Sequence, residues 1–352
     1  MNLIPDCAMP EFMAAKAQSA LPPIREWRNV TLRQFEAEVV PRNEPAVLRG
    51  LVDHWPATAA ARESLESIRT YLSRLDRGAR VRTFVGDAAM GGRFFYSPKL
   101  DGFNFGIAEA PFAQLLAVLE NESDDRHVYM GSTHTSEILP GFEQENPLDL
   151  VQSRPTGPRI WIGNPSRIAT HFDESDNIAC VVSGTRRFTL FPPDQVENLY
   201  PGPVDTTVAG QPTSLVDLAD PDLERFPKFA QALEHAQTAE LQPGDAIYIP
   251  ALWWHGVEST GPFNVLINYW WQDTPLDAGS PMNALGAALL SIGLLPEAKR
   301  LAWRAIFDHY VFGGREEAVE HIPTHARGIL GDSTPELRRT MREFLIRELK
   351  GR

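Results

Sequence analysis

The sequence predicts an all-β core, either a sandwich or a barrel, with helices before and after it. Between His127 and Trp271, short runs of β-branched and aromatic residues alternate with clusters of Gly, Pro, Asn and Asp. This texture is typical of sandwiches and barrels rather than of alternating strand–helix units. After Pro281 the apolar residues recur at helical spacing instead. Strands are therefore expected in the middle of the chain and helices at its end.

Six runs are expected to be strands of the core because they are short, apolar and bounded by turn residues. They are His127–Met130, Arg159–Ile162, Ile178–Val182, Arg187–Phe191, Ala246–Ile249 and Phe263–Trp271.

The segment before the core is expected to mix helices and strands. Between Ser64 and Leu75, four apolar residues recur at helical spacing, namely Leu65, Ile68, Leu72 and Leu75. This periodicity predicts a helix with one buried face. The pair Thr334-Pro335 predicts the start of the last helix, because Thr caps a helix and Pro suits its first position. We therefore expect three parts: residues 1–125 packing on the barrel, the core over 126–275, and a helical extension over 276–352.

Composition excludes several functional classes. Only two cysteines occur, Cys7 and Cys180, so neither a disulfide scaffold nor a cysteine-rich metal site is expected, and a reducing cytoplasm is the expected location. No apolar run approaches the length of a membrane span, and the N-terminus lacks the pattern of a signal peptide. The 46 acidic residues outnumber the 33 basic ones and give a net charge of −13. This balance disfavours a nucleic-acid partner.

Two fragments of the core carry residues that suit a metal site. His171 and Asp173 are two positions apart, so an extended chain projects both side chains from one face. The second fragment has a Pro243-Gly244-Asp245 turn, then a strand, then His255. If the two fragments are neighbours in one barrel, two imidazoles and one carboxylate converge. That donor set holds ferrous iron and leaves three coordination positions open.

Each fragment alone has an ordinary explanation. A single His-x-Asp pair is common on surfaces, and a single histidine at a strand end is more often a hydrogen-bonded structural residue. The combination is stronger, because both fragments are flanked by apolar strand sequence that has no other need for a charged group.

The chain resembles the cupin-like, Jumonji-C-type oxygenases, including the asparaginyl hydroxylase that acts on hypoxia-inducible factor. The resemblance runs from about Pro23 to Asp273. It is carried by the following segments: Glu44–Gly50, His54–Pro56, His171–Tyr200 with Phe191-Pro-Pro193, Leu241–His255 and Asn264–Trp270. It implies a double-stranded β-helix, or jelly roll, and chemistry with Fe(II), 2-oxoglutarate and O2.

The resemblance also implies roles for particular residues. The iron ligands match His171, Asp173 and His255, and Tyr129 resembles a tyrosine that reaches a carboxylate of 2-oxoglutarate. Two further positions, Asn177 and Asn268, match polar residues that line the co-substrate or the open face of the metal.

The chain departs from the asparaginyl hydroxylase at two positions. Arg186 stands where that enzyme has a lysine for the distal carboxylate of 2-oxoglutarate, and Ile168 replaces a threonine. Strand alternation places Arg186 on the apolar side with Phe188 and Leu190, so an inward guanidinium needs an anion. That anion is either 2-oxoglutarate or a nearby structural carboxylate. The missing threonine hydroxyl removes one polar contact.

The resemblance implies hydroxylation of a C–H bond with release of succinate and CO2. A protein side chain of the asparagine, aspartate, histidine or arginine class is the expected substrate, and a small molecule is the alternative. Two other functions stay open: a metal-binding cupin that does not use 2-oxoglutarate, and a catalytically silent binding module. Relatives with helical extensions often form dimers. The apolar helix expected over Ala284–Leu295 also needs a cover, so a homodimer through the C-terminal helices is expected.

Overall fold

The computed structural model describes residues 21–121, 123–208 and 210–351. The first 20 residues of the expected N-terminal segment, including Cys7, lie outside the described residues. The chain divides into two compact units, one that ends at Trp271 and one that spans Gln272–Arg352. Among the described residues, no helix combines the length and the apolar character that crossing a membrane requires.

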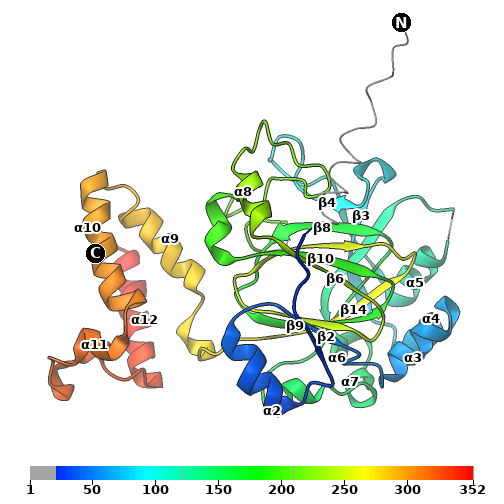
Figure 1. Ribbon diagram of the computed structural model, residues 1–352, viewed down its shortest axis with the longest axis horizontal. Coiled ribbons are helices and arrows are strands. Elements are labelled where there is room, and N and C mark those ends of the chain that lie inside the picture. Colours follow the sequence, from blue (N-terminus) through cyan, green and yellow to red (C-terminus); the bar gives the residue numbers. More distant parts are fainter. Residues whose placement is uncertain (1–20, 122, 209, 352) are drawn as a thin grey trace, which may run out of the picture. The chain divides into compact units, whose positions relative to one another are not determined.

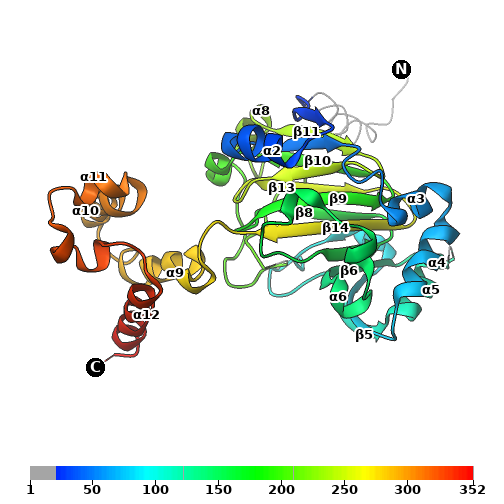
Figure 2. The ribbon, with the colours of Figure 1, turned by 90° about the horizontal axis from the view of Figure 1, so that it is seen from below.

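Two sheets form the first unit (Figures 1 and 2). The larger sheet has nine strands in the spatial order β1 (Glu26–Arg28), β2 (Ala46–Arg49), β12 (Ala246–Ile249), β9 (Asp176–Ser183), β14 (Asn264–Trp271), β7 (Arg159–Gly163), β6 (His127–His134), β3 (Arg80–Gly86) and β5 (Gly106–Pro111). The smaller sheet has five, in the order β11 (Gln237–Leu241), β10 (Arg186–Phe191), β13 (Trp254–Ser259), β8 (Ser166–His171) and β4 (Arg93–Phe94).

Most strand pairs are antiparallel and join segments that are far apart in the sequence. β9, for example, lies between β12 and β14 and pairs with both. Only the β1–β2 and β4–β8 pairs of the described strands are parallel. This arrangement confirms the predicted all-β, jelly-roll-like core. Strands β1 to β5 belong to these two sheets, so the segment before residue 126 contributes to the sheets themselves.

The two faces of the larger sheet have separate cores. Ala179 and Val181 of β9 point inward and pack with Phe188 and Leu190 of β10 in the opposite sheet. Their neighbour Cys180 points to the other face, where the helices lie. This alternation follows from the two-residue period of a strand. Each fully buried large apolar side chain of this kind stabilises the fold by roughly 1.5–3 kcal/mol.

Most helices of the first unit add side chains to the core on the outer face of the larger sheet (Figure 2), whereas the helix that carries Phe229 and Ala232 packs on Phe191 and Trp254 of the smaller sheet. The helices are α2 (Leu32–Gln34), α3 (Pro56–Glu63), α4 (Leu65–Leu75), α5 (Phe112–Glu120), α6 (Thr135–Ile138), α7 (Phe142–Glu145) and α8 (Phe229–Glu234).

Helix α4 confirms the predicted helix with one correction. The Ser64 hydroxyl accepts a hydrogen bond from the backbone N–H of Ser67 and caps the helix, and Ile68, Leu72 and Leu75 are buried. The expectation that Leu65 shares the buried face is wrong, because this side chain is 36% exposed. Leu65 occupies the first helical position, at the end of the buried stripe.

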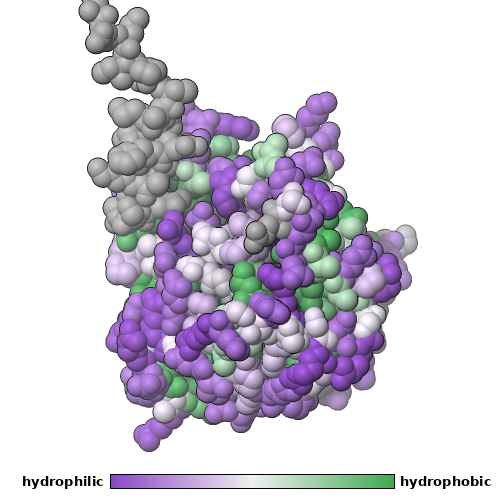
Figure 3. All heavy atoms as spheres, turned by 90° about the vertical axis from the view of Figure 1, so that its right-hand side faces the viewer, coloured by the Kyte–Doolittle hydropathy of each residue, from purple (hydrophilic) through white to green (hydrophobic). Residues whose placement is uncertain are grey.

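The face of the molecule drawn in Figure 3 is predominantly hydrophilic, with small hydrophobic patches between the polar residues. Such a surface agrees with a net charge of −13 and with the burial of the large apolar side chains in the cores described above.

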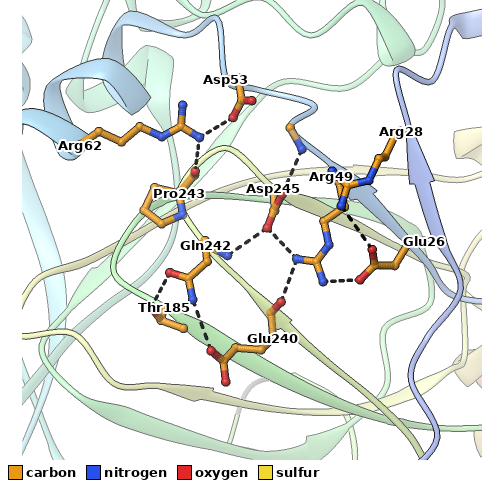
Figure 4. Close-up of polar contacts among 11 residues, drawn as sticks. Glu26, Arg28, Arg49, Asp53, Arg62, Thr185, Glu240, Gln242, Pro243 and Asp245 are labelled. Carbon is orange, nitrogen blue, oxygen red and sulfur yellow. Dashed lines mark hydrogen bonds and ion pairs between the residues drawn. The ribbon is translucent and has the colours of Figure 1, made fainter.

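A network of charged side chains holds the turn that precedes β12 (Figure 4). The Asp245 carboxylate accepts hydrogen bonds from Arg49 Nη1 at 2.7 Å, from the Gly50 N–H at 3.0 Å and from the Gln242 N–H at 3.2 Å. Arg49 also donates to Glu26 at 2.6 Å.

The turn also requires glycine at position 244. Gly244 has a φ of +104°, and a Cβ there would lie 2.0 Å from Asp53 Oδ1. The predicted turn is thus fixed to the strands beside it.

We expect Asp245→Asn to lower the free energy of unfolding by about 1–3 kcal/mol, since it removes the charge that strengthens three hydrogen bonds. Urea denaturation of the variant, compared with Asp220→Asn on the exposed surface, measures the effect. Equal losses in both variants would show that the network does not stabilise the turn.

In the second unit, the described residues form helices joined by short connections and no strand. The unit contains α9 (Pro281–Ser291), α10 (Glu297–Phe307), α11 (Arg315–Val319) and α12 (Pro335–Leu349). The Thr334 hydroxyl accepts a hydrogen bond from the Leu337 N–H at 3.2 Å, which confirms the predicted cap of the last helix. Several apolar side chains of this unit are exposed, including Leu290 (64%), Leu294 (79%) and Phe312 (75%).

Candidate metal centre and its cavity

The two predicted histidines come from neighbouring strands of the smaller sheet. β8 and β13 are antiparallel, and His171 lies directly opposite His255 in their register. The centroids of the two rings are 4.4 Å apart. A register irregularity follows His255, so the pairing resumes only at Val257. Fragments that are 84 positions apart are therefore brought together, as the sequence predicted.

Each imidazole presents the same nitrogen to the space between them. Nδ1 of His171 lies 2.9 Å from the carbonyl oxygen of Ala169, and Nδ1 of His255 lies 3.0 Å from that of Trp253. A carbonyl oxygen only accepts, so both Nδ1 atoms carry the proton and donate. The Nε2 atoms are left with free lone pairs, which is the tautomer that a metal ligand needs.

Asp173 completes the cluster from the segment just after β8. Its Oδ2 lies 3.6 Å from Nε2 of His255. One ligand atom from each of His171, Asp173 and His255 lies within 4.8 Å of the others, and no other group of three such side chains occurs in the described part of the chain. Two imidazole nitrogens and one carboxylate oxygen are the donor set of a ferrous site with open positions. The residues therefore fit such an ion.

The surroundings keep His255 neutral. Its side chain is buried, and burial together with the neighbouring His171 lowers the pKa of His255 to about 4, although Asp173 opposes this effect. Only the neutral imidazole can bind a metal. At neutral pH, burial therefore keeps protons from competing with a metal ion for Nε2 of His255.

The cluster faces a cavity between the two sheets that is open to solvent. Its walls come from both sheets and from three connecting segments, which carry Phe105, Asp173 and Val208. The lining residues used below are Phe84, Phe94, Phe105, Tyr129, Trp161, Ile168, Asn177, Arg186, Val208, Val257, Asn268 and Trp270, together with the three residues of the cluster.

Arg186 lies in the interior of this cavity and points inward, as strand alternation predicted. It is opposite Ser259 on β13, whereas His255 is opposite Leu190. Four residues along a strand separate the two levels by about 13 Å. The backbone of Arg186 and that of His255 therefore lie at different levels along the strands that line one cavity.

The Arg186 side chain is only 2% exposed, yet its hydrogen-bonding capacity is largely unused. It bonds to Tyr129, while Nε and Nη2 are buried without a partner among the described residues. Burial lowers the pKa of Arg186 and raises that of Tyr129. No carboxylate of the described residues pairs with Arg186, so the alternative of a structural carboxylate finds no support. A buried cation of this kind requires an anion.

The two predicted asparagines line the cavity on the larger sheet and bond to each other. Asn268 Nδ2 donates to Asn177 Oδ1 at 3.1 Å. The Asn268 oxygen accepts from the indole N–H of Trp161 at 2.7 Å. Trp161 was not expected to be part of the site, although its inward position follows from the alternation of β7. It fixes which way the Asn268 amide points.

Known proteins resemble the chain over its core. A family model described as "Cupin-like domain" matches residues 32–277. "Lysine-specific demethylase JMJ31" of Arabidopsis thaliana is 37% identical over 32% of this chain, and the match spans 20% of that relative. "tRNA wybutosine-synthesizing protein 5" of Mus musculus is 27% identical over 79% of this chain and 91% of its own length. The human "Bifunctional peptidase and (3S)-lysyl hydroxylase JMJD7" is 25% identical over 74% and 88%, respectively.

The matched region contains every strand of the two sheets except β1, together with the metal cluster and the lining of the cavity. The match to the plant demethylase spans only about a fifth of that protein, whereas the other two relatives are covered over most of their length. Together with the geometry above, the family match over 32–277 shows that the chain belongs to the cupin-like, Jumonji-C-type family.

Proposed function

We propose that the protein is an Fe(II)- and 2-oxoglutarate-dependent oxygenase that hydroxylates a C–H bond and releases succinate and CO2. One observation carries the proposal. A buried guanidinium without an anion, Arg186, lies in the same cavity as the His171, Asp173 and His255 cluster. The human relative's name includes "(3S)-lysyl hydroxylase", which agrees with this chemistry.

The protein's own residues would act by placement. His171 and His255 would bind the ion through Nε2, and Asp173 would supply the third ligand. Arg186 would pair with the distal carboxylate of 2-oxoglutarate through its planar fork. Tyr129 accepts from Arg186, so its own O–H is free to donate to the same carboxylate. When bound, iron with 2-oxoglutarate and O2 supplies the oxidation of the substrate C–H bond.

Two features of the chain would tune the site further. The Asn177–Asn268 pair would present fixed amides beside the co-substrate, because Trp161 holds Asn268. Apolar walls would exclude water from the reacting groups, which strengthens every electrostatic interaction among them.

The substrate is proposed to be a protein side chain of the asparagine, aspartate, histidine or arginine class. A small molecule is the alternative within the same chemistry. A succinate-release assay with Fe(II), 2-oxoglutarate and libraries of peptides and metabolites tests cofactor use and substrate class together. Succinate that rises with one class of compound supports the proposal. Oxidation of a substrate without consumption of 2-oxoglutarate would favour a cupin that does not use this co-substrate.

We also propose that the protein acts in the cytoplasm as a homodimer joined through its C-terminal helices. The exposed apolar side chains of the second unit support the homodimer, since Leu276 is 88% and Leu290 is 64% exposed. Exposed apolar surface of this extent commonly marks an interface.

We expect static light scattering to give a dimer mass for the full chain and a monomer mass for a chain that ends at Asp273. The helices would bury apolar surface only when both copies carry them. A dimer mass that survives the truncation would contradict the helical interface.

A further inference from the structure

The lining of the cavity changes in polarity from its interior to its entrance. The residues with polar side chains outside the metal cluster are all buried, namely Tyr129, Asn177, Arg186 and Asn268. We call the partly exposed lining residues the entrance of the cavity. Apart from the metal cluster, these are all apolar or aromatic: Phe84, Phe105, Trp161, Ile168, Val208, Val257 and Trp270.

The aromatic residues of the entrance form a continuous packed wall. Phe84 and Phe105 have ring centroids 5.0 Å apart, and Phe94 packs on both at 6.4 and 5.5 Å. Phe94 also packs on Tyr129 at 5.6 Å. These rings come from β3, β4 and the loop before β5, so they are held by three separate segments. The departure at Ile168, which lies opposite Phe94 in the β4–β8 register, adds another apolar group beside the cluster.

Charges inside the cavity leave no counter-ion for a charged substrate group. Asp173 belongs to the metal cluster, and Arg186 is assigned to the co-substrate. The formal charges of a divalent ion, Asp173, a 2-oxoglutarate dianion and Arg186 cancel. Among the described lining residues there is no further carboxylate or cation. Aromatic faces attract a desolvated cation by about 2 kcal/mol, which is less than the several kcal/mol that an ion loses when it leaves water without a partner.

We infer that the entrance selects an uncharged group, so that the side chain placed before the metal is neutral. This inference rests on the proposed function and narrows its substrate class. Asparagine, neutral histidine and apolar side chains fit the entrance, whereas arginine, lysine and aspartate do not.

The test uses the full-length protein loaded with Mn(II), with and without the unreactive co-substrate analogue N-oxalylglycine. Three probes of nearly equal shape differ in charge: benzyl alcohol, benzylammonium and benzoate. Bound Mn(II) accelerates the proton relaxation of any probe that enters the cavity. We expect benzyl alcohol to show half-maximal relaxation at a concentration at least about tenfold lower than either charged probe, a difference of about 1.4 kcal/mol. Equal or tighter binding of a charged probe would overturn the inference.

Two variants and a matched control test whether the residues of the entrance cause the preference for an uncharged probe. Phe105→Glu places a carboxylate in the entrance and is expected to reverse the preference toward benzylammonium. Val208→Glu, in a loop of the same entrance, is expected to do the same and does not depend on the packing of the aromatic wall. Phe103 stacks on Phe105 at 5.2 Å but does not line the cavity. Phe103→Glu should therefore keep the neutral preference, and a reversal there would also overturn the inference.

The outcomes separate this inference from the proposed function. Failure of N-oxalylglycine to bind the metal-loaded protein would count against the use of 2-oxoglutarate. With the analogue bound, so that Arg186 and the open metal positions are occupied, the order of the three probes decides whether the entrance prefers a neutral group.

Discussion

Replacing Asp173 or His171 by alanine is expected to lower iron-dependent formation of succinate from 2-oxoglutarate by more than about 100-fold. Loss of residues that merely orient metal ligands already costs 10–100-fold, and each of these changes removes one of the three ligands. Purified variants, compared with the parent protein at equal Fe(II) and 2-oxoglutarate concentrations, give the measurement.

A matched change outside the site serves as the control. His54 is exposed and belongs to no metal cluster in the described part of the chain, so His54→Ala should keep the parent rate. Unchanged succinate formation in both Asp173→Ala and His171→Ala would refute the assignment of the metal ligands.

For Arg186→Met we expect opposite effects on binding and on stability. Removing one partner of a buried charge pair costs about 2–5 kcal/mol, so the dissociation constant of 2-oxoglutarate should rise at least about 30-fold. Without co-substrate, the free energy of unfolding of the variant should equal that of the parent or exceed it by up to about 4 kcal/mol, because the variant no longer buries an unpaired cation. Calorimetric titration and urea denaturation measure the two quantities.

Arg186→Lys tests the importance of the guanidinium itself. Lysine retains the positive charge but loses the planar fork, so its affinity for 2-oxoglutarate should lie between those of the parent and Arg186→Met. An Arg186→Met variant that binds 2-oxoglutarate as tightly as the parent would show that this residue does not hold the co-substrate.

The His171–Asp173 pair and the direction of Arg186 were predictable because both follow from the two-residue period of a strand, whereas the approach of His255 depends on the pairing of β8 with β13 and its role as a ligand was implied by the resemblance. His171 and Asp173 share a face by spacing, and Arg186 shares its face with Phe188 and Leu190. The six runs were predictable as strands because each is short, rich in apolar residues and bounded by turn residues. Strands β8 and β13, which carry the two histidines, were not among those runs. Their polar residues, such as Arg167 and Glu258, face the outer side of the smaller sheet and interrupt the apolar pattern.

The entrance of the cavity was not predictable from local patterns. Phe84, Phe94 and Phe105 lie before the expected core, and only the pairing of β3 with β6 and of β4 with β8 brings them to the site. Trp161 was expected in a strand, but its bond to Asn268 depends on the register between β7 and β14. The register between distant strands depends on the whole fold, so it cannot be predicted from the sequence of any single segment.

An anaerobic titration of the Fe(II)-loaded protein with 2-oxoglutarate tests the proposed function most directly. Binding of the keto acid to the iron produces a visible charge-transfer absorption, which can be followed without O2 or substrate. We predict saturation at one equivalent per chain, no absorption for His171→Ala, and a large shift to higher concentrations for Arg186→Met. Full loading with iron but no binding of 2-oxoglutarate would contradict the proposed function and favour a cupin that works without this co-substrate.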